Sequence, residues 1–278
     1  MLPLSREELE KFLDNIFHED IRAGDITTNT VIPENVKLKV QMVAREDMFL
    51  AGLPLAAECF IKLDPKAKIN FGNSDGNPAK SGEVLLTVSG KARALLTAER
   101  VALNLVQHLS GIATYTNEYV KEIEGTNATL LDTRKTTPGL RVLEKYATNM
   151  GGAENHRMGL FDAVMIKDNH IAIGGGISET IKKAKAKALK NIEVECDTIG
   201  QVIEALSAGA DRLLLDNMSI GDLKKAISLN KGKIPLEASG GVTLDTILAI
   251  AKTGVEYISV GCITQSAPAV DIGLDFLS

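Results

Sequence analysis

The sequence predicts an α/β fold whose second half forms a parallel sheet. Short runs rich in leucine or β-branched residues recur there, and segments of helical character separate them. The runs follow one another at intervals of roughly 20 to 35 residues, and strands that alternate with helices in this way form a parallel sheet. There are six such units, fewer than the eight of a complete barrel.

Each predicted strand is a short apolar run, and each predicted helix has a polar residue where a helix begins. The strands are predicted at Thr129–Thr133, Ala163–Lys167, Ile192–Cys196, Arg212–Asp216, Pro235–Ser239 and Tyr257–Gly261. The helices between them are predicted to begin at the N-cap residues Ser178, Thr198, Ser219 and Thr243. Gly209 and Gly254 stand where two of these helices are expected to end.

Composition limits the classes of protein to which the chain can belong. A chain of 278 residues that is 45% hydrophobic can bury one large core, or a barrel and a smaller domain. Its 36 acidic residues against 31 lysines and arginines give a net charge of −5. This balance argues against nucleic acid and against an anionic membrane surface as partners.

Cysteine usage and the N-terminal sequence favour the cytoplasm. Cys59, Cys196 and Cys262 are odd in number and far apart, which predicts neither a disulfide framework nor a CxxC metal site. The N-terminal residues include several acidic side chains and no apolar signal core, and no stretch approaches the ~18 apolar residues of a membrane span. A soluble cytoplasmic protein is expected.

Polar groups end the predicted strands and are the main functional signal. The C-terminal ends of parallel barrel strands converge on one face, where active sites form. Any one of these residues could be an ordinary loop residue, but six successive polar strand ends favour a shared site. The strand ends carry Asp132 with Arg134 and Lys135, Lys167, Glu195, Asp216, Ser239 with Gly240 and Gly241, and Gly261.

The charges of these candidates fit a substrate with several anionic groups. Arginine binds carboxylate or phosphate through two hydrogen bonds, and lysine supplies a mobile charge. The carboxylates Glu195 and Asp216, beside a polyphosphate, could hold Mg²⁺. Gly240 and Gly241 suit either a phosphate on backbone N–H groups or a tight turn. The cationic candidates are Arg100, Arg134, Lys135, His156, Arg157 and Lys167.

Several segments resemble the quinolinate phosphoribosyltransferase family, which decarboxylates its product. They are LDTRKTTPGLRVLEKYA, GGAENHRMGLFDAVMIKDNHI, IEVECDT, LLLDNMS, LEASGGV and ISVGCITQSAPAVDIGLDF, with EDIRAGDITTNTVIP and LTAERVALNLVQHLSGIAT in the first half. The resemblance implies an N-terminal α/β sandwich domain at residues 1–108, on which residues 267–278 pack back. It also implies an open, incomplete α/β barrel of about six strands at residues 109–266.

The resemblance further implies a function in NAD biosynthesis. The enzyme would transfer phosphoribosyl from phosphoribosyl pyrophosphate to quinolinate and release pyrophosphate and CO₂. Lys135, Lys167, Glu195 and Asp216 would be the catalytic group, and the last two would place Mg²⁺. The two carboxylates of quinolinate would bind Arg134, Lys135, His156 and Arg157. Lys135 and Lys167 would also contact the pyrophosphate, and Ser239, Gly240, Gly241 and Gly261 would hold the 5′-phosphate.

The resemblance also implies a homodimer or larger homo-oligomer in which Arg100 enters the neighbouring subunit's site. From its residues alone, Arg100 could equally be a solvent-exposed helix arginine. Three other functions stay open from the sequence. The enzyme could act on another pyridine acid, it could be an aldolase that uses Lys167 as a Schiff-base amine, or the fold could serve a non-catalytic phosphoribosyl-binding regulator.

Overall fold

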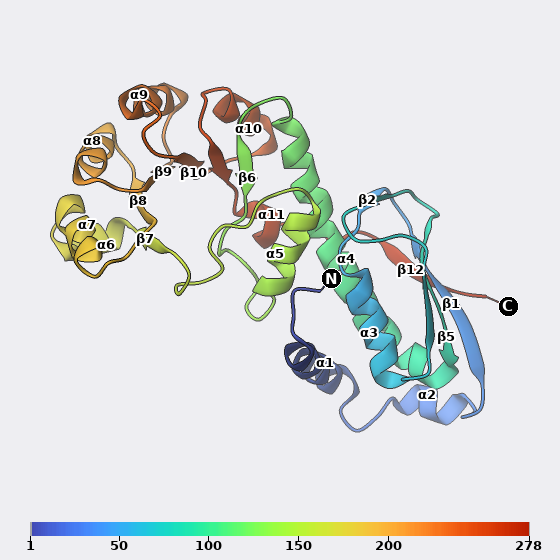
Figure 1. Ribbon diagram of the computed structural model, residues 1–278. Helices are drawn as coiled ribbons and strands as arrows, with labels where there is room; N and C mark the ends of the chain where they lie inside the picture. The colour runs from blue at the N-terminus through green and yellow to red at the C-terminus, as the bar shows by residue number, and fades with distance from the viewer. Residues whose placement is uncertain (1, 278) are drawn as a thin grey trace. The chain divides into compact units, whose positions relative to one another are not determined.

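A computed structural model describes residues 2–277 of the chain, which divide into two compact units (Figure 1). Unit 1 contains the residues up to Asn117, the segment Pro138–Gly152 and the residues from Ser266 onward. Unit 2 contains Glu118–Thr137 and Ala153–Gln265. No helix in the described part of the chain is both long and apolar enough to cross a membrane.

Unit 1 is built on an antiparallel sheet of four strands in the order β12-β1-β5-β3. These strands are β1 (Lys37–Ala44), β3 (Lys68–Phe71), β5 (Val84–Lys91) and β12 (Ile272–Phe276). A small separate sheet pairs β2 (Met48–Phe49) with β4 (Pro78–Ala79). The helices are α1 (Arg6–Ile21), α2 (Ile26–Val31), α3 (Leu53–Leu63), α4 (Ala92–Glu122), whose last turn belongs to unit 2, and α5 (Arg141–Met150).

The core of unit 1 joins its helices to its sheet. Leu13 of α1, Phe60 of α3, Leu95 of α4 and Leu86 of β5 are all fully buried in one apolar cluster. The C-terminal segment packs closely on α4, because a Cβ added at Gly111 would lie 2.1 Å from the carbonyl oxygen of Pro268. The strand β12 then pairs with β1 along five residues, from Ala44 to Val40.

Unit 2 contains the parallel sheet that the sequence predicts. Its six strands are β6 (Thr129–Leu131), β7 (Val164–Ile166), β8 (Ile192–Cys196), β9 (Arg212–Asp216), β10 (Leu236–Ser239) and β11 (Tyr257–Ser259). They lie in the order β6-β11-β10-β9-β8-β7, and every pairing is parallel. Since β6 and β7 form the two edges, the sheet is an open barrel and not a closed one.

Helices alternate with these strands. They are α6 (Asp168–Gly174), α7 (Ile177–Ala186), α8 (Ile199–Ala208), α9 (Ile220–Asn230), α10 (Leu244–Ala251) and α11 (Cys262–Gln265). Figure 1 shows α7, α8, α9 and α10 following one another outside the strands, and neighbouring helices of this series pack together. The outer ring therefore leaves the opposite face of the sheet for the site.

Three of the four predicted N-caps are correct. Thr198 and Ser219 accept hydrogen bonds from the backbone of Gln201 and Asp222, and Thr243 is the N-cap of α10. The prediction for Ser178 is wrong, because α7 begins at Ile177 after Gly176, which has a φ of +100°. Ser178 instead donates its hydroxyl to Glu204 at 2.8 Å, which joins α7 to α8.

Strand register decides which side chains face the inside of the barrel. Side chains alternate between the two faces of a strand, so residues two apart share one face. Glu193 lies opposite Arg212, and Glu195 lies opposite Leu214. Leu214 is in turn opposite Glu237, which is opposite Tyr257. The inner face thus carries charged groups both inside the strands and at their C-terminal ends.

Candidate active site

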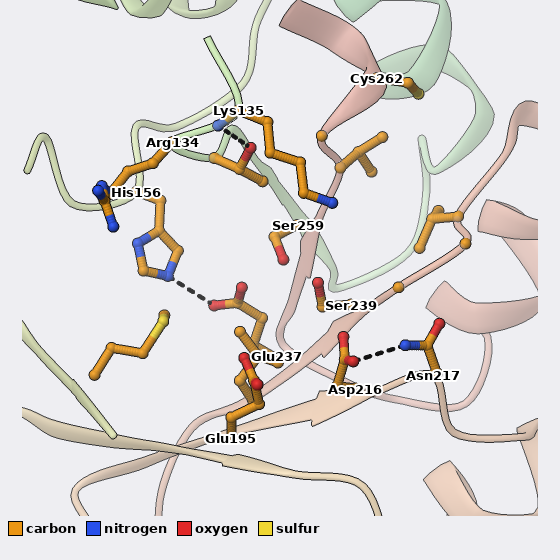
Figure 2. Close-up of a pocket in the computed structure, with 18 of the residues that line it drawn as sticks. Arg134, Lys135, His156, Glu195, Asp216, Asn217, Glu237, Ser239, Ser259 and Cys262 are labelled. Atoms are coloured by element: carbon orange, nitrogen blue, oxygen red, sulfur yellow. Dashed lines mark hydrogen bonds and ion pairs between the residues drawn. The ribbon is translucent and has the colours of Figure 1, made fainter. Parts of the chain in front are cut away.

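A cavity of about 670 Å³ lies in unit 2 at the C-terminal ends of the strands (Figure 2). It is the face on which parallel barrels build their active sites. Of the candidate residues named from the sequence, all but Arg100 and Asp132 line it. Those that line it are Arg134, Lys135, His156, Arg157, Lys167, Glu195, Asp216, Ser239, Gly240, Gly241 and Gly261. Arg100 lies on an exposed position of α4 in unit 1.

Lys135 extends into the cavity from the loop after β6 (Figure 2). Its backbone is held on both sides, since its N–H donates to Thr133 Oγ1 at 3.0 Å and its carbonyl accepts from Thr264 Oγ1 at 2.7 Å. Gly261 leaves room for its side chain, because a Cβ there would lie 2.7 Å from Lys135 Cδ. A larger residue at Gly261, which follows β11, would therefore collide with Lys135, and the sequence does not show this contact.

Arg134 and Arg157 form a second cationic group of the cavity. Burial and the nearby charge of Arg134 lower the pKa of the Arg157 guanidinium, although arginine keeps its charge at any physiological pH. Within residues 2–277, the buried Nε of Arg134 has no hydrogen-bond partner. An anion bound here would pair with this N–H and reduce the repulsion between the two guanidinium groups.

The acidic residues lie at the ends of β8 and β9. Glu195 forms an ion pair with Lys167, which follows the neighbouring strand β7. Asp216 accepts a hydrogen bond of 2.6 Å from the side chain of Asn217. Both carboxylates line the same cavity as the cations. The cavity therefore offers acceptors for hydroxyl groups or a metal ion as well as donors for anions.

The turn after β10 has a backbone that only glycine fits. Gly240 has a φ of +88°, and a Cβ there would lie 2.3 Å from Asn217 Oδ1. Asn217 itself has a positive φ of 52°, and its N–H donates to Ser239 O at 2.9 Å. The Gly-Gly pair thus packs against the β9 loop and leads to α10, whose N-cap is Thr243.

His156 is fixed by contacts on both ring nitrogens. Its Nε2 lies 3.3 Å from Glu193 Oε2 and 3.4 Å from Glu237 Oε2. Figure 2 shows the contact with Glu237. Its Nδ1 accepts from the backbone N–H of Arg157 at 2.7 Å. The loop that carries it is anchored by Asp132, which accepts from the His156 N–H at 2.8 Å.

The contacts of the two ring nitrogens have opposite effects on the charge of the His156 ring. Burial alone would lower its pKa, but hydrogen bonds and charge from Glu193 and Glu237 raise it to about 9. The Arg157 N–H bond to Nδ1 favours the neutral ring, since Nδ1 cannot accept this bond and carry a proton. One such bond is worth ~1 kcal/mol, whereas one hydrogen bond to a charged group is worth ~1.5–3 kcal/mol. Nε2 has a single N–H, which the two carboxylates share at 3.3 and 3.4 Å, and their negative charge adds to its effect. The carboxylates prevail, and we expect a charged ring at neutral pH.

Glu193, Arg212 and Glu237 are the important residues that the sequence analysis missed. Within the strands, Glu193 is two residues before Glu195 and Glu237 two before Ser239, so each shares the inner face with a predicted site residue. This spacing was the available signal. Arg212 lies 3.0 Å from Glu193 and forms an ion pair with Glu237.

Both of these glutamates, together with His156, bear on the question of a buried metal. His156, Glu193 and Glu237 are the group of potential metal ligands that lies closest together within the described residues, with ligand atoms within 4.8 Å of one another. However, Arg212 contacts both carboxylates and also stacks on Tyr257, at 4.1 Å from the ring centre. A guanidinium therefore occupies the place where a cation would compensate these charges.

The fold and the cavity define an α/β-barrel enzyme for small anionic substrates, and comparison with known proteins identifies its family. Residues 25–110 match the family model "Quinolinate phosphoribosyl transferase, N-terminal domain", and residues 112–275 match the model of the C-terminal domain. The chain therefore belongs to the quinolinate phosphoribosyltransferase family. This confirms the family resemblance that the motifs indicated.

Relatives and solved structures agree along nearly the whole chain. A probable nicotinate-nucleotide pyrophosphorylase [carboxylating] of Bacillus subtilis is 44% identical over 270 residues, covering 96% of this chain and 93% of the relative. The nicotinate-nucleotide pyrophosphorylase structure from Ehrlichia chaffeensis has a TM-score of 0.93 at 43% identity and covers 99% of both chains. A human nicotinic acid phosphoribosyltransferase, at 12% identity with a TM-score of 0.67 over 96% of this chain and 74% of that one, shares the fold only.

We predict that His156 titrates far above an ordinary histidine. The chain has four histidines, and in an NMR titration of ring-labelled enzyme one signal should change charge near the pKa of about 9 given by its carboxylate partners. The signal should be absent from a His156→Gln variant. A His156 signal that titrates at or below the ordinary value of ~6.5 would contradict a charged ring.

Proposed function

We propose that this enzyme transfers the phosphoribosyl group of phosphoribosyl pyrophosphate to the nitrogen of quinolinate and removes one carboxyl group as CO₂. The products are nicotinate mononucleotide, pyrophosphate and CO₂, as a step of NAD biosynthesis. The observation that carries the proposal is the cavity, in which Arg134, Lys135, Arg157 and Lys167 face two carboxylates at adjacent strand ends. Membership of the family supports it independently.

The arginine side of the cavity suits quinolinate. Arg134, Arg157 and the charged ring of His156 supply donors for two carboxylates. Figure 2 shows the Lys135 side chain extending into the cavity away from Arg134 and His156. Guanidinium groups bind carboxylates through paired hydrogen bonds. The Nε of Arg134, buried and without a hydrogen-bond partner in the described chain, supports a carboxylate at this wall.

The opposite side suits phosphoribosyl pyrophosphate. Lys135 and Lys167 would contact the pyrophosphate, and Glu195 and Asp216 would accept hydrogen bonds from the ribose hydroxyls. Ser239, Gly240, Gly241 and Gly261 would hold the 5′-phosphate through backbone N–H groups near the start of α10. The close packing of Gly240 on Asn217 and of Gly261 on Lys135 supports a fixed backbone at both places.

Positioning and electrostatics supply the chemistry. As the bond from C1 of the ribose to pyrophosphate breaks, lysine charge stabilises the leaving oxygens while the pyridine nitrogen attacks C1. The ring nitrogen becomes cationic on transfer. Loss of the neighbouring carboxyl group then leaves an electron pair on carbon that this positive charge stabilises, and a proton from water replaces CO₂. No covalent intermediate with the protein is needed.

Two alternative functions use the same cavity. An aldolase would need Lys167 to present a free lone pair to a carbonyl, but this amine is held in an ion pair by Glu195. An enzyme for a different pyridine acid would differ in the number of carboxylates it pairs.

The cellular location of this chain is a separate proposal. The similar plant proteins include a chloroplastic and a mitochondrial one. For this chain we propose the cytoplasm, in keeping with its three cysteines, which form no disulfide.

We predict that the enzyme uses quinolinate and discriminates against nicotinate by at least about 100-fold in kcat/KM. A site that hydrogen-bonds two carboxylates leaves buried cations unpaired when one carboxylate is missing, and such losses are costly. The assay follows pyrophosphate and CO₂ with each acid. Equal release of both products from quinolinate is expected, and comparable turnover of nicotinate would show that the substrate assignment is wrong.

We propose Mg²⁺ as the cofactor, placed by Glu195 and Asp216 either directly or through bound water. Their carboxylates fit this ion by type, because Mg²⁺ prefers oxygen ligands and is usually bound by one or two carboxylates together with water and substrate phosphate. Both residues line the cavity, beside the place proposed for the pyrophosphate. When bound, the ion would neutralise charge on the departing pyrophosphate.

We predict that EDTA abolishes turnover and that excess Mg²⁺ restores it. Asp216→Asn should raise the Mg²⁺ concentration for half-maximal rate about tenfold, since one negative ligand is lost. Asp222→Asn, a change on α9 outside the cavity lining, is the matched control and should leave this concentration unchanged. Full activity in EDTA would refute the metal requirement.

We also propose that the enzyme works as a homodimer or larger assembly, with Arg100 completing the site of the neighbouring subunit. Arg100 is exposed on α4, and the apolar side chains around it, such as Leu95 and Leu103, are buried in unit 1. Its guanidinium is therefore presented at the surface of its own unit. A dimer in which α4 approaches another subunit's cavity would add a further cation to the pyridine acid.

We predict that Arg100→Ala and Lys135→Ala each nearly abolish activity and that mixed subunits recover part of it. In a hybrid dimer, one site combines an intact Lys135 with a donated intact Arg100, so up to about half of the sites in a hybrid are complete. Subunits are mixed, dissociated and reassociated before assay, and hybrids are verified by mass. Hybrids no more active than either parent would place Arg100 outside a shared site.

A further inference from the structure

A buried ion cluster lies beneath the cavity and has no role in the mechanism above. We define it as Glu193, Arg212 and Glu237, on the inner faces of β8, β9 and β10. The side chains of Glu193 and Glu237 are 7% and 0% exposed, and that of Arg212 is 25% exposed. Glu237 also lines the cavity floor.

The cluster carries two carboxylates against one guanidinium. Arg212 Nε lies 3.0 Å from Glu193, the same guanidinium pairs with Glu237, and the Tyr257 ring covers it at 4.1 Å. Removing charges from water is expensive unless each is compensated, and burial beside Glu237 raises the pKa of Glu193. A further positive charge nearby would favour the ionised form of both carboxylates. His156 Nε2, at 3.3 and 3.4 Å from the two carboxylates, is placed to supply it.

We propose that Glu193, Arg212 and Glu237 are positioning residues that hold His156 as a cation, whose Nδ1–H then joins the Arg157 backbone N–H to bind one carboxylate of the pyridine substrate. This inference rests on the proposed function for its substrate. It assigns the cluster a task in substrate affinity in addition to its part in barrel packing.

The geometry around Nδ1 explains why an anion is needed. In the neutral ring, Nδ1 accepts from the Arg157 N–H at 2.7 Å. Once the ring is protonated, both atoms carry hydrogens and can no longer bond to each other. The two N–H groups must then turn away from each other, and two adjacent donors on one loop can bind the two oxygens of a carboxylate. The bound anion thus replaces a hydrogen bond that protonation removes.

Other charges near the ring act in both directions. Four other cations line the cavity and disfavour a further positive charge. They are Arg134, Lys135, Arg157 and Lys167. Asp132 accepts the backbone N–H of His156, and Arg212 partly neutralises the two glutamates. Even so, Glu193 and Glu237 together raise the pKa of the ring to about 9. A bound carboxylate would favour the charged ring further.

The test compares Glu237→Gln with the wild-type enzyme in a steady-state assay. This change removes one negative charge with little change in shape, so His156 should lose much of its positive charge at neutral pH. We expect the KM for quinolinate to rise about tenfold or more, as for the loss of a charge-assisted hydrogen bond, and the KM for phosphoribosyl pyrophosphate to stay within about twofold. In NMR, the His156 titration should move to lower pH.

Glu144→Gln is the matched control. Glu144 is a fully buried glutamate that lies 2.9 Å from a histidine, His108, but in unit 1 and outside the cavity lining. It should lower thermal stability without a selective change in the KM for quinolinate. If Glu237→Gln does not fold, Glu193→Gln provides the same measurement, because it removes the other carboxylate and keeps the pair of Arg212 with Glu237.

Three results would overturn the inference. They are folded variants with unchanged KM for quinolinate, an equal rise in the KM for both substrates, and Zn²⁺ binding by the wild type that Glu237→Gln abolishes, which would make the cluster a metal site. The NMR titration separates this inference from the proposed function. If the wild type does not turn over quinolinate, the function fails, whereas an unshifted His156 titration in Glu237→Gln refutes the cluster's effect by itself.

Discussion

Parallel pairing of six strands in a fixed register is the constraint on which the site depends. Because every strand runs in the same direction, all C-terminal ends meet at one edge, and because side chains alternate, residues two apart share the inner face. Glu193 and Glu195, or Glu237 and Ser239, therefore form two levels of one interior. A slip of one residue in any strand would turn its charged groups toward the apolar helices outside.

The sequence was sufficient to predict the upper level of this interior, which consists of the residues at the C-terminal ends of the strands. A polar residue at the end of an apolar run can be recognised from the sequence alone. Lys167 after β7 and Asp216 at the end of β9 are examples. The lower level was not predicted, because the spacing of two residues places Glu237 on the face of Ser239 but does not show which residues of other strands lie beside it. Only the register shows that Glu193, Arg212 and Glu237 meet and that His156 reaches them from a distant loop.

The sequence is also insufficient to predict every helix start and the unit to which each helix belongs. Ser178 has the right chemistry for an N-cap, but Gly176 turns the chain one residue before α7 begins. The helix α5 lies between two segments of unit 2 in the sequence, yet it belongs to unit 1. Its apolar side chains Leu143 and Ala147 are buried in that unit's core, and Tyr146 donates to Asp75 at 2.7 Å. Such membership is decided by tertiary packing, which periodicity does not encode.

The pairing of β12 with β1 constrains the order in which the two units can fold during synthesis. Domains that are contiguous in sequence can fold in turn as they are synthesised, but the sheet of unit 1 receives its edge strand only after all six strands of unit 2 have been made. Until then, β1 has an unpaired edge, which is a template for association with other chains. All six barrel strands are therefore synthesised while the sheet of the first unit still lacks its edge strand.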